Sequence, residues 1–149
     1  MRAATTTIAL TLCDIDTPIW FDRTAREAAA YLAFHCGAPV VEAPGLARFG
    51  FVADPAAAPP LGEFELGTDE YPERSATIII QVRALYGGTG RRLTGPGIRG
   101  ETRLSVEGLP DRFWAEREAL IELFPRGVDV FLITGEQFAS LPRTTRAAS

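Results

Sequence analysis

Residues 92–100 (RLTGPGIRG) have the glycine density of an anion-binding loop. In such a loop, successive backbone amides point into one concavity and can bind a phosphate. The stretch lies between two runs that look like strands, however, and no capped helix follows it, so it does not match a dinucleotide-binding motif. The residues therefore favour a wide turn over a phosphate site, with Gly95 and Gly97 as candidate contact positions for a substrate or a partner.

A second polar cluster lies near the end of the sequence, at residues 141–146 (LPRTTR). Arg143, Thr144 and Thr145 together offer a guanidinium group and two hydroxyl groups, which could bind a phosphate or a phosphonate. The same residues could instead contact a partner protein or form a solvated tail. The sequence leaves these alternatives open.

The single histidine, His35, precedes Cys36 at the end of a predicted helix. A metal site needs three or four ligands at workable spacing, so we predict that the chain holds no metal ion. A histidine at a helix end is more often satisfied by nearby carbonyl groups than used as a ligand. His35 is nevertheless kept as a candidate substrate-binding or partner-binding residue, and no catalytic residue can be assigned.

Asp14 and Asp16 follow an apolar run (LTLCDIDTP), which superficially matches phosphotransferases that use a strand-end aspartate as nucleophile. That pattern requires threonine or valine where Pro18 stands, and it usually requires a lysine further along the chain. We therefore interpret the two aspartates as a polar turn that closes a strand.

The composition excludes several kinds of chemistry. All 15 basic residues are arginine, so the chain has no lysine to form a Schiff base with pyridoxal phosphate (PLP), and no lysine for a Walker-type phosphate loop. The net charge of −4 argues against a nucleic-acid or anionic-membrane surface. No run approaches the roughly 20 apolar residues that span a bilayer, and the first residues make a poor signal peptide, so we expect a cytoplasmic protein.

The elements that would position these residues alternate between strands and helices. With 149 residues, 46% of them hydrophobic, we expect one domain over residues 1–149. Thr24 and Glu27 have capping-box spacing before a helix that Gly37 ends, and Asp111 can cap a helix that runs to about Phe124. A long loop is expected over residues 54–75, and the predicted strands are residues 6–13, 47–52, 77–82, 91–94, 101–106 and 128–134.

The predicted architecture is an α/β sandwich around a mixed sheet. Residues 91–94 and 101–106 are expected to form a half-exposed antiparallel pair near a sheet edge. Strands 77–82 and 128–134 are nearly continuous in β-branched and apolar residues, which is typical of strands covered on both faces. Because the sequence offers only two long amphipathic helices to cover them, we predict a homodimer.

Six segments in order resemble the PhnH family, whose members belong to the bacterial carbon–phosphorus lyase system. They are LTLCDIDTPIW, LAFHCGAP, RSATIIIQV, RLTGPGI, FPRGVDVFLITG and LPRTT, and the resemblance runs from about Thr6 to Thr145. The resemblance implies a three-layer α/β sandwich similar to the large domain of PLP-dependent transferases, but without PLP. Members of this family usually carry a few dozen further residues before the first predicted strand.

The resemblance also implies a role in phosphonate degradation. With partner subunits G, I and L, the family supports the displacement of adenine from ATP by a phosphonate, which gives a ribose 1-phosphonate 5-triphosphate, and subunit J later breaks the carbon–phosphorus bond. Two hypotheses follow for this chain. It is a noncatalytic assembly subunit, or it binds the nucleotide or the phosphonate directly and contributes to an active site.

Overall fold

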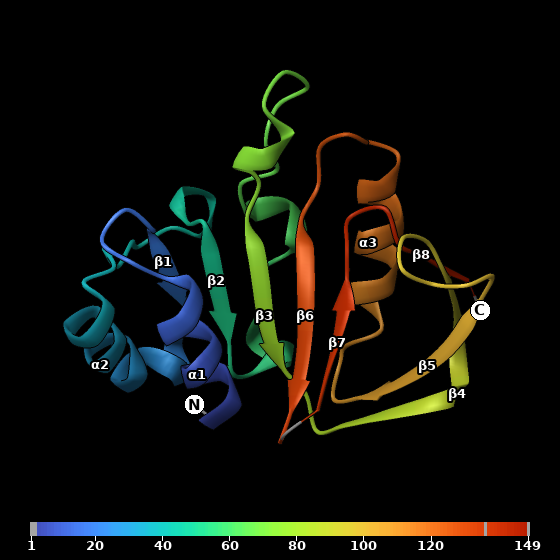
Figure 1. The fold of residues 1–149 in the computed structure, drawn as a ribbon, viewed down its shortest axis with the longest axis horizontal. Helices are drawn as coiled ribbons and strands as arrows, with labels where there is room; N and C mark the ends of the chain where they lie inside the picture. Colours follow the sequence, from blue (N-terminus) through green and yellow to red (C-terminus); the bar gives the residue numbers. More distant parts are fainter. Residues whose placement is uncertain (1–2, 136, 149) are drawn as a thin grey trace.

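The computed structural model describes residues 3–135 and 137–148 as an α/β fold built on two sheets (Figure 1). Short 3₁₀ helices η1 to η5 occupy several connections: Arg23–Ala25, Pro44–Leu46, Pro55–Ala57, Leu61–Glu63 and Pro72–Arg74. The longer elements are α1 (Ala3–Leu12), β1 (Ile19–Phe21), α2 (Arg26–Cys36), β2 (Phe49–Val52), β3 (Thr77–Gln81), β4 (Ala84–Thr94), β5 (Thr102–Glu107), α3 (Arg112–Ile121), β6 (Asp129–Thr134), β7 (Gln137–Leu141) and β8 (Arg146–Ala148).

The larger sheet is mixed and has the strand order β1-β2-β3-β6-β7. Its first four strands are parallel, with Ile19 beside Phe49, Phe49 beside Thr77 and Thr77 beside Asp129, and β7 joins β6 in the antiparallel direction. The smaller sheet is antiparallel, with the order β5-β4-β8. The predicted α/β fold with a mixed sheet is therefore confirmed.

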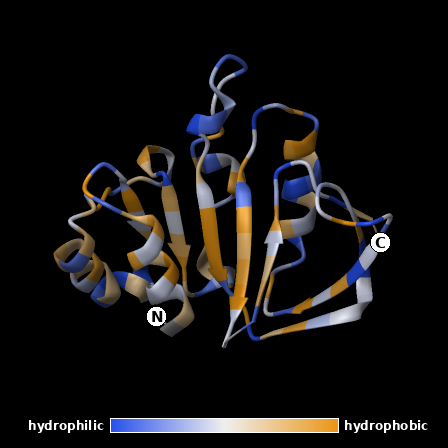
Figure 2. Cartoon of the chain, viewed as in Figure 1, coloured by the Kyte–Doolittle hydropathy of each residue, from blue (hydrophilic) through white to orange (hydrophobic). Residues whose placement is uncertain are grey.

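Both faces of the larger sheet are covered within one chain. One core cluster includes Phe51, Ile79 and Ile133 and packs with α1 and α2, whereas the other includes Ile78 and Ile80 and packs with η4, α3 and the smaller sheet. Figure 2 shows β3 and β6 as largely hydrophobic, as expected of such strands. The homodimer was predicted because the sequence offered too few helices to cover both faces of the sheet. In the described residues both faces are covered within one chain, so that reason for a homodimer does not hold.

The runs that became β2, β3 and β6 were predicted correctly, within two residues at each end. The hairpin of β4 and β5 is also antiparallel as predicted, although it belongs to the smaller sheet. The helix ending at Gly37 is confirmed as α2, and Gly37 has the left-handed conformation (φ 69°) that favours glycine after a helix. The 54–75 loop contains the short helices η3, η4 and η5, and Leu61 of η4 and the following Phe64 are buried in the core.

The predicted strand at residues 6–13 is wrong, because these residues belong mostly to helix α1. β-Branched residues favour strands only weakly, and tertiary packing often overrides that preference. Here Ala9 and Cys13 are buried against α2 and the sheet, and the hydroxyl of Thr11 donates to the carbonyl oxygen of Thr7 (2.8 Å) one turn earlier. The turn at Asp14 consequently closes a helix rather than a strand.

Two predicted helix caps are also wrong. Asp22, not Thr24, caps the turn that leads into α2, and its carboxylate accepts hydrogen bonds from both the amide of Ala25 and the hydroxyl of Thr24 (2.9 Å each). Asp111 has helical backbone angles, and its side chain makes no capping hydrogen bond. In the described ranges, no helix is long and apolar enough to cross a membrane.

Candidate functional site

The structure brings the two polar clusters of the sequence together. β4 and β8 pair at Thr94 and Arg146, so the glycine-rich turn lies beside residues 141–146. Within that turn the amide of Ile98 donates to the carbonyl oxygen of Gly95 (3.1 Å), and Pro96 and Gly97 (φ 78°) have the sequence of a type II turn. The predicted turn is therefore confirmed, and contact of Gly95 and Gly97 with a substrate or a partner stays a prediction.

Gly95 is required where the two segments meet. Its φ of 147° is one that other residues rarely adopt, and a Cβ atom at this position would lie 3.0 Å from the Cα atom of Thr145. Gly97 faces open space instead. The glycine at position 95 thus allows two backbones to approach closely, whereas Gly97 serves the turn.

Arg143 is held by contacts inside the molecule. Its guanidinium group donates to the carboxylate of Asp129 (2.8 Å) and to the carbonyl oxygen of Pro72 (2.6 Å), and its backbone amide donates to the other carboxylate oxygen of Asp129 (2.7 Å). The side chain of Arg143 is only 18% exposed. The arrangement links the start of β6, the loop at η5 and the C-terminal segment, so this segment is not a solvated tail.

A buried arginine supports the same segment from α3. Arg117 is 4% exposed and donates to the carbonyl oxygens of Pro142 (2.8 Å) and Thr145 (3.4 Å). Burial lowers the pKa of Arg117 to about 10, and the nearby carboxylate of Asp129 partly opposes this shift. Thr145 is 2% exposed, and Thr144 is half-buried. A ligand at these residues would have to compete with several intramolecular hydrogen bonds.

His35 lies apart from these clusters, at the end of α2 on the opposite side of the molecule (Figure 1). Its ring is exposed and contacts the rings of Tyr31 (centroids 4.1 Å apart) and Phe34 (5.1 Å). Across residues 3–135 and 137–148, no group of three or more histidine, cysteine or acidic residues is placed to hold a metal ion.

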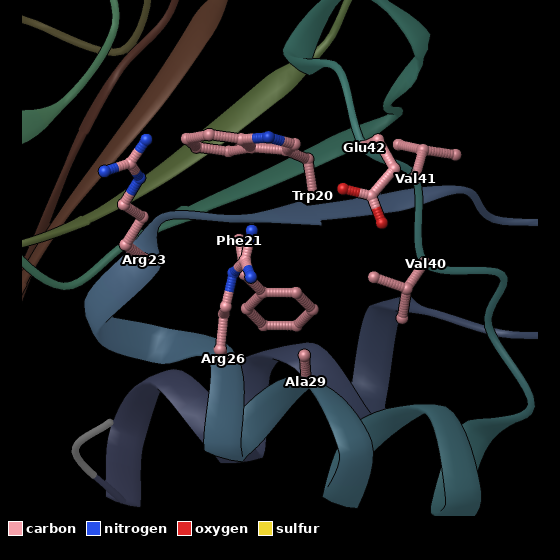
Figure 3. Close-up of a pocket in the computed structure, with 8 residues that line it drawn as sticks. All are labelled: Trp20, Phe21, Arg23, Arg26, Ala29, Val40, Val41 and Glu42. Carbon is pink, nitrogen blue, oxygen red and sulfur yellow. The ribbon is translucent and has the colours of Figure 1, made fainter.

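A polar groove that was not predicted from the sequence lies beside Trp20. This groove has a cavity volume of about 410 Å³. It is bounded by Trp20 and Phe21 of β1, by Arg23 of η1, by Arg26 and Ala29 of α2, and by residues 40–42, and we call it the Trp20 groove. Figure 3 shows Trp20 and Phe21 on opposite sides of the strand, with Arg23 and Glu42 towards opposite ends of the groove.

The groove forms where strand pairing stops. The amide of Ile19 donates to the carbonyl oxygen of Pro39 (2.8 Å), and the amide of Val41 donates to the carbonyl oxygen of Ile19 (2.9 Å). The backbone groups of Phe21 point to the same edge of β1, because alternate residues of a strand do so. Among the described residues, however, no hydrogen bond joins Phe21 to residues 40–42. The chain segments separate there and leave the cavity between them.

Asp22 fixes the residues that carry the two arginines. It is 3% exposed. One carboxylate oxygen holds the turn of η1 through Ala25 and Thr24, and the other accepts from the amides of Ala53 (2.7 Å) and Asp54 (2.8 Å) at the end of β2. A single carboxylate thus ties β1, η1 and β2 together, which sets the positions from which Arg23 and Arg26 project.

A further cavity of about 340 Å³ lies at the carboxyl ends of β2 and β3, a common place for ligands in α/β sheets. Its charged side chains already have partners. Arg83 pairs with Glu107 (3.6 Å), and Asp54 accepts a hydrogen bond from the amide of Ala56 (3.1 Å). The Trp20 groove is therefore the better candidate for a charged ligand.

Comparison with known proteins relates nearly the whole chain to one protein family. A family model described as "Bacterial phosphonate metabolism protein (PhnH)" matches residues 1–148. The chain is 43% identical, over 144 residues, to "Alpha-D-ribose 1-methylphosphonate 5-triphosphate synthase subunit PhnH" of Rhizobium meliloti (strain 1021), and the alignment covers 93% of the chain and 70% of that protein. It is 44% identical over 80 residues to "Putative C-P lyase subunit protein HtxG" of Stutzerimonas stutzeri, covering 54% of the chain and 41% of that protein.

Proposed function

Because the chain belongs to the PhnH family of bacterial phosphonate metabolism proteins, we propose that it is a subunit of a carbon–phosphorus lyase system. In this role it supports the formation of a ribose 1-phosphonate 5-triphosphate from ATP and a phosphonate. The observation that carries the proposal is the 43% identity, along 93% of the chain, to a protein named as a subunit of such a synthase.

We expect the chain to act with partner subunits G, I, J and L and to form a homodimer when purified alone. Support for an association surface comes from α1, α2 and the segment between them, where large apolar side chains are exposed. They are Leu10 (41% exposed), Leu12 (46%), Ile15 (73%), Tyr31 (50%) and Phe34 (84%). Of these side chains, Tyr31 and Phe34 both contact the ring of His35, and an exposed apolar patch is typical of an interaction site. His35 lies among these residues, which makes partner contact its more reasonable role.

The cytoplasm is the expected location, since the ATP that such a synthase consumes is there. We further propose that the chain works without PLP, since it contains no lysine for a Schiff base. The likeness to the large domain of PLP-dependent transferases, which the family resemblance implies, would then be one of fold only. Incubation with pyridoxal phosphate followed by gel filtration should leave no visible chromophore on the protein, and a retained chromophore would contradict a cofactor-free subunit.

The subunit role can be tested in a bacterium whose own gene for this subunit is deleted. The tagged chain should restore growth on methylphosphonate as the sole phosphorus source and should co-purify the other subunits. Light scattering of the isolated chain tests the homodimer separately. If the chain neither restores growth nor retains any partner subunit, the proposed function is wrong.

A further inference from the structure

The side chains of the two arginines of the Trp20 groove, Arg23 and Arg26, have no partner in the part of the chain that the structure describes. Across residues 3–135 and 137–148, the side chain of neither Arg23 nor Arg26 makes a hydrogen bond or an ion pair, and both residues are exposed. Other arginines of this acidic chain do pair with carboxylates, namely Arg83, Arg92, Arg112, Arg126 and Arg143. Two neighbouring arginines that face one cavity without a carboxylate partner favour an anion from outside the chain.

The cavity is too large for a small anion alone. Its volume of about 410 Å³ falls within the range of roughly 300–1,000 Å³ that is typical of sites for small organic ligands. A neighbouring cavity of about 290 Å³ shares Trp20, Arg23 and Glu42 with it, so the concave surface continues past the indole ring. A methylphosphonate at the arginines would leave most of this space, and the indole, without a contact.

The chemistry of the lining differs along the groove. Trp20 provides a flat aromatic surface, while Arg23 and Glu42 lie towards opposite ends (Figure 3). Aromatic side chains bind bases by stacking. Arginine binds phosphate oxygens through two parallel hydrogen bonds, and a carboxylate accepts hydrogen bonds from hydroxyl or amino groups. A ligand that matches all three features has a flat ring, a strongly anionic end, and hydroxyl or amino donors.

We propose that the Trp20 groove binds a nucleoside triphosphate, with the base against the indole of Trp20, the phosphates at Arg23 and Arg26, and donor groups at Glu42. The proposal rests on the proposed function in that the synthesis consumes ATP, and it adds a site to that function. It makes the chain a direct nucleotide-binding subunit rather than an assembly subunit alone.

The test measures ligand binding to the full chain by calorimetry and by tryptophan fluorescence. The sequence has two tryptophans, so a Trp114→Phe variant reports on Trp20 alone. The probes are ATP, adenosine, inorganic triphosphate and methylphosphonate. We expect ATP to bind with one site per chain and to quench Trp20, and we expect adenosine and triphosphate to bind at least about tenfold more weakly, because each lacks one half of the contacts.

Arg23→Gln and Arg26→Gln should each weaken ATP binding by about 10- to 100-fold, the loss expected for a charge-assisted hydrogen bond. Their melting temperatures should stay at the wild-type value, because the side chain of neither arginine has a partner among the described residues. Arg103→Gln is the control for binding, since it removes one exposed arginine that lies in the smaller sheet, far from β1, and that donates from its guanidinium group to the carbonyl oxygen of Gly90 (3.0 Å). It should bind ATP like the wild type.

Any of three results would contradict the proposed nucleotide site. The first is no ATP binding at a few millimolar, and the second is a loss of ATP affinity in Arg103→Gln equal to that in the groove variants. The third is methylphosphonate binding tighter than that of ATP. Triphosphate binding as tight as that of ATP would remove the role of Trp20. If ATP does not bind and Arg23→Gln loses its partner subunits instead, the groove is a docking edge for an extended partner segment. Intact co-purification without ATP binding rejects the site and leaves the subunit role standing.

Discussion

Replacing Arg143 by alanine should destabilise the fold, because this side chain links three parts of the chain. The substitution removes a charged hydrogen bond to Asp129 (2.8 Å) and a bond to the carbonyl oxygen of Pro72 (2.6 Å), and it keeps the backbone amide bond to Asp129 (2.7 Å). A hydrogen bond to a charged group contributes about 1.5–3 kcal/mol. The lower end applies to the bond with Asp129, which is 33% exposed, and the bond to Pro72 adds about 1 kcal/mol.

The expected loss is therefore about 2–3 kcal/mol in the free energy of unfolding, measured by urea denaturation with a fluorescence readout. For a chain of this size, it corresponds to a fall of about 4–12 °C in the melting temperature. A double-mutant cycle with Asp129→Asn should give a coupling energy of about 1 kcal/mol or more. Arg146→Ala is the control: Arg146 is exposed and has no side-chain partner among the described residues, so its loss should stay below about 0.5 kcal/mol.

A loss below about 0.5 kcal/mol for Arg143→Ala would refute this reasoning. If that variant also failed to grow on methylphosphonate while its melting curve was unchanged, the side chain would be free to bind a ligand or a partner. A destabilised variant that still co-purifies the other subunits would support the structural role.

The remaining predictions concern the backbone, the cap and a thiol. Gly95→Ala should lower the free energy of unfolding by about 2–3 kcal/mol and Gly97→Ala by about 1 kcal/mol, because only the Cβ atom at position 95 would meet Thr145. Equal losses for the two variants in urea denaturation would contradict this. Asp22→Asn should cost about 2–4 kcal/mol, since an amide has one acceptor oxygen for a site that receives four hydrogen bonds, and an unchanged melting curve would be inconsistent with it. Burial raises the pKa of the Cys13 thiol to about 12, so at pH 8 only about one thiol in ten thousand is a thiolate. Iodoacetamide should therefore label Cys13 only after unfolding, as followed by mass spectrometry. Equal labelling rates in the folded and unfolded states would disprove the burial.

Local sequence patterns correctly predicted those elements in which consecutive side chains are all buried. The run TIIIQ reads as a covered strand because each side chain has to be apolar when both faces are packed, and β3 has that environment. The sequence missed α1, since threonine-rich runs suit either a strand or a helix, and the choice was made by packing on α2. It also suggested Thr24 as a cap, because nothing local shows that the carboxylate of Asp22 reaches both η1 and the end of β2.

The sequence by itself determined what depends only on which residues are present: the absence of lysine excludes a Schiff base, and the ordered segments assign the family. Tertiary structure decided which arginines are available to a ligand. Arg143 looks free in the sequence but is held by Asp129, 14 residues away, and by Pro72, 71 residues away. Arg23 and Arg26 look like ordinary helix-start residues, yet they face a cavity that exists because residues 40–42 diverge from Phe21. Such contacts join positions far apart in the chain, and only folding brings them together.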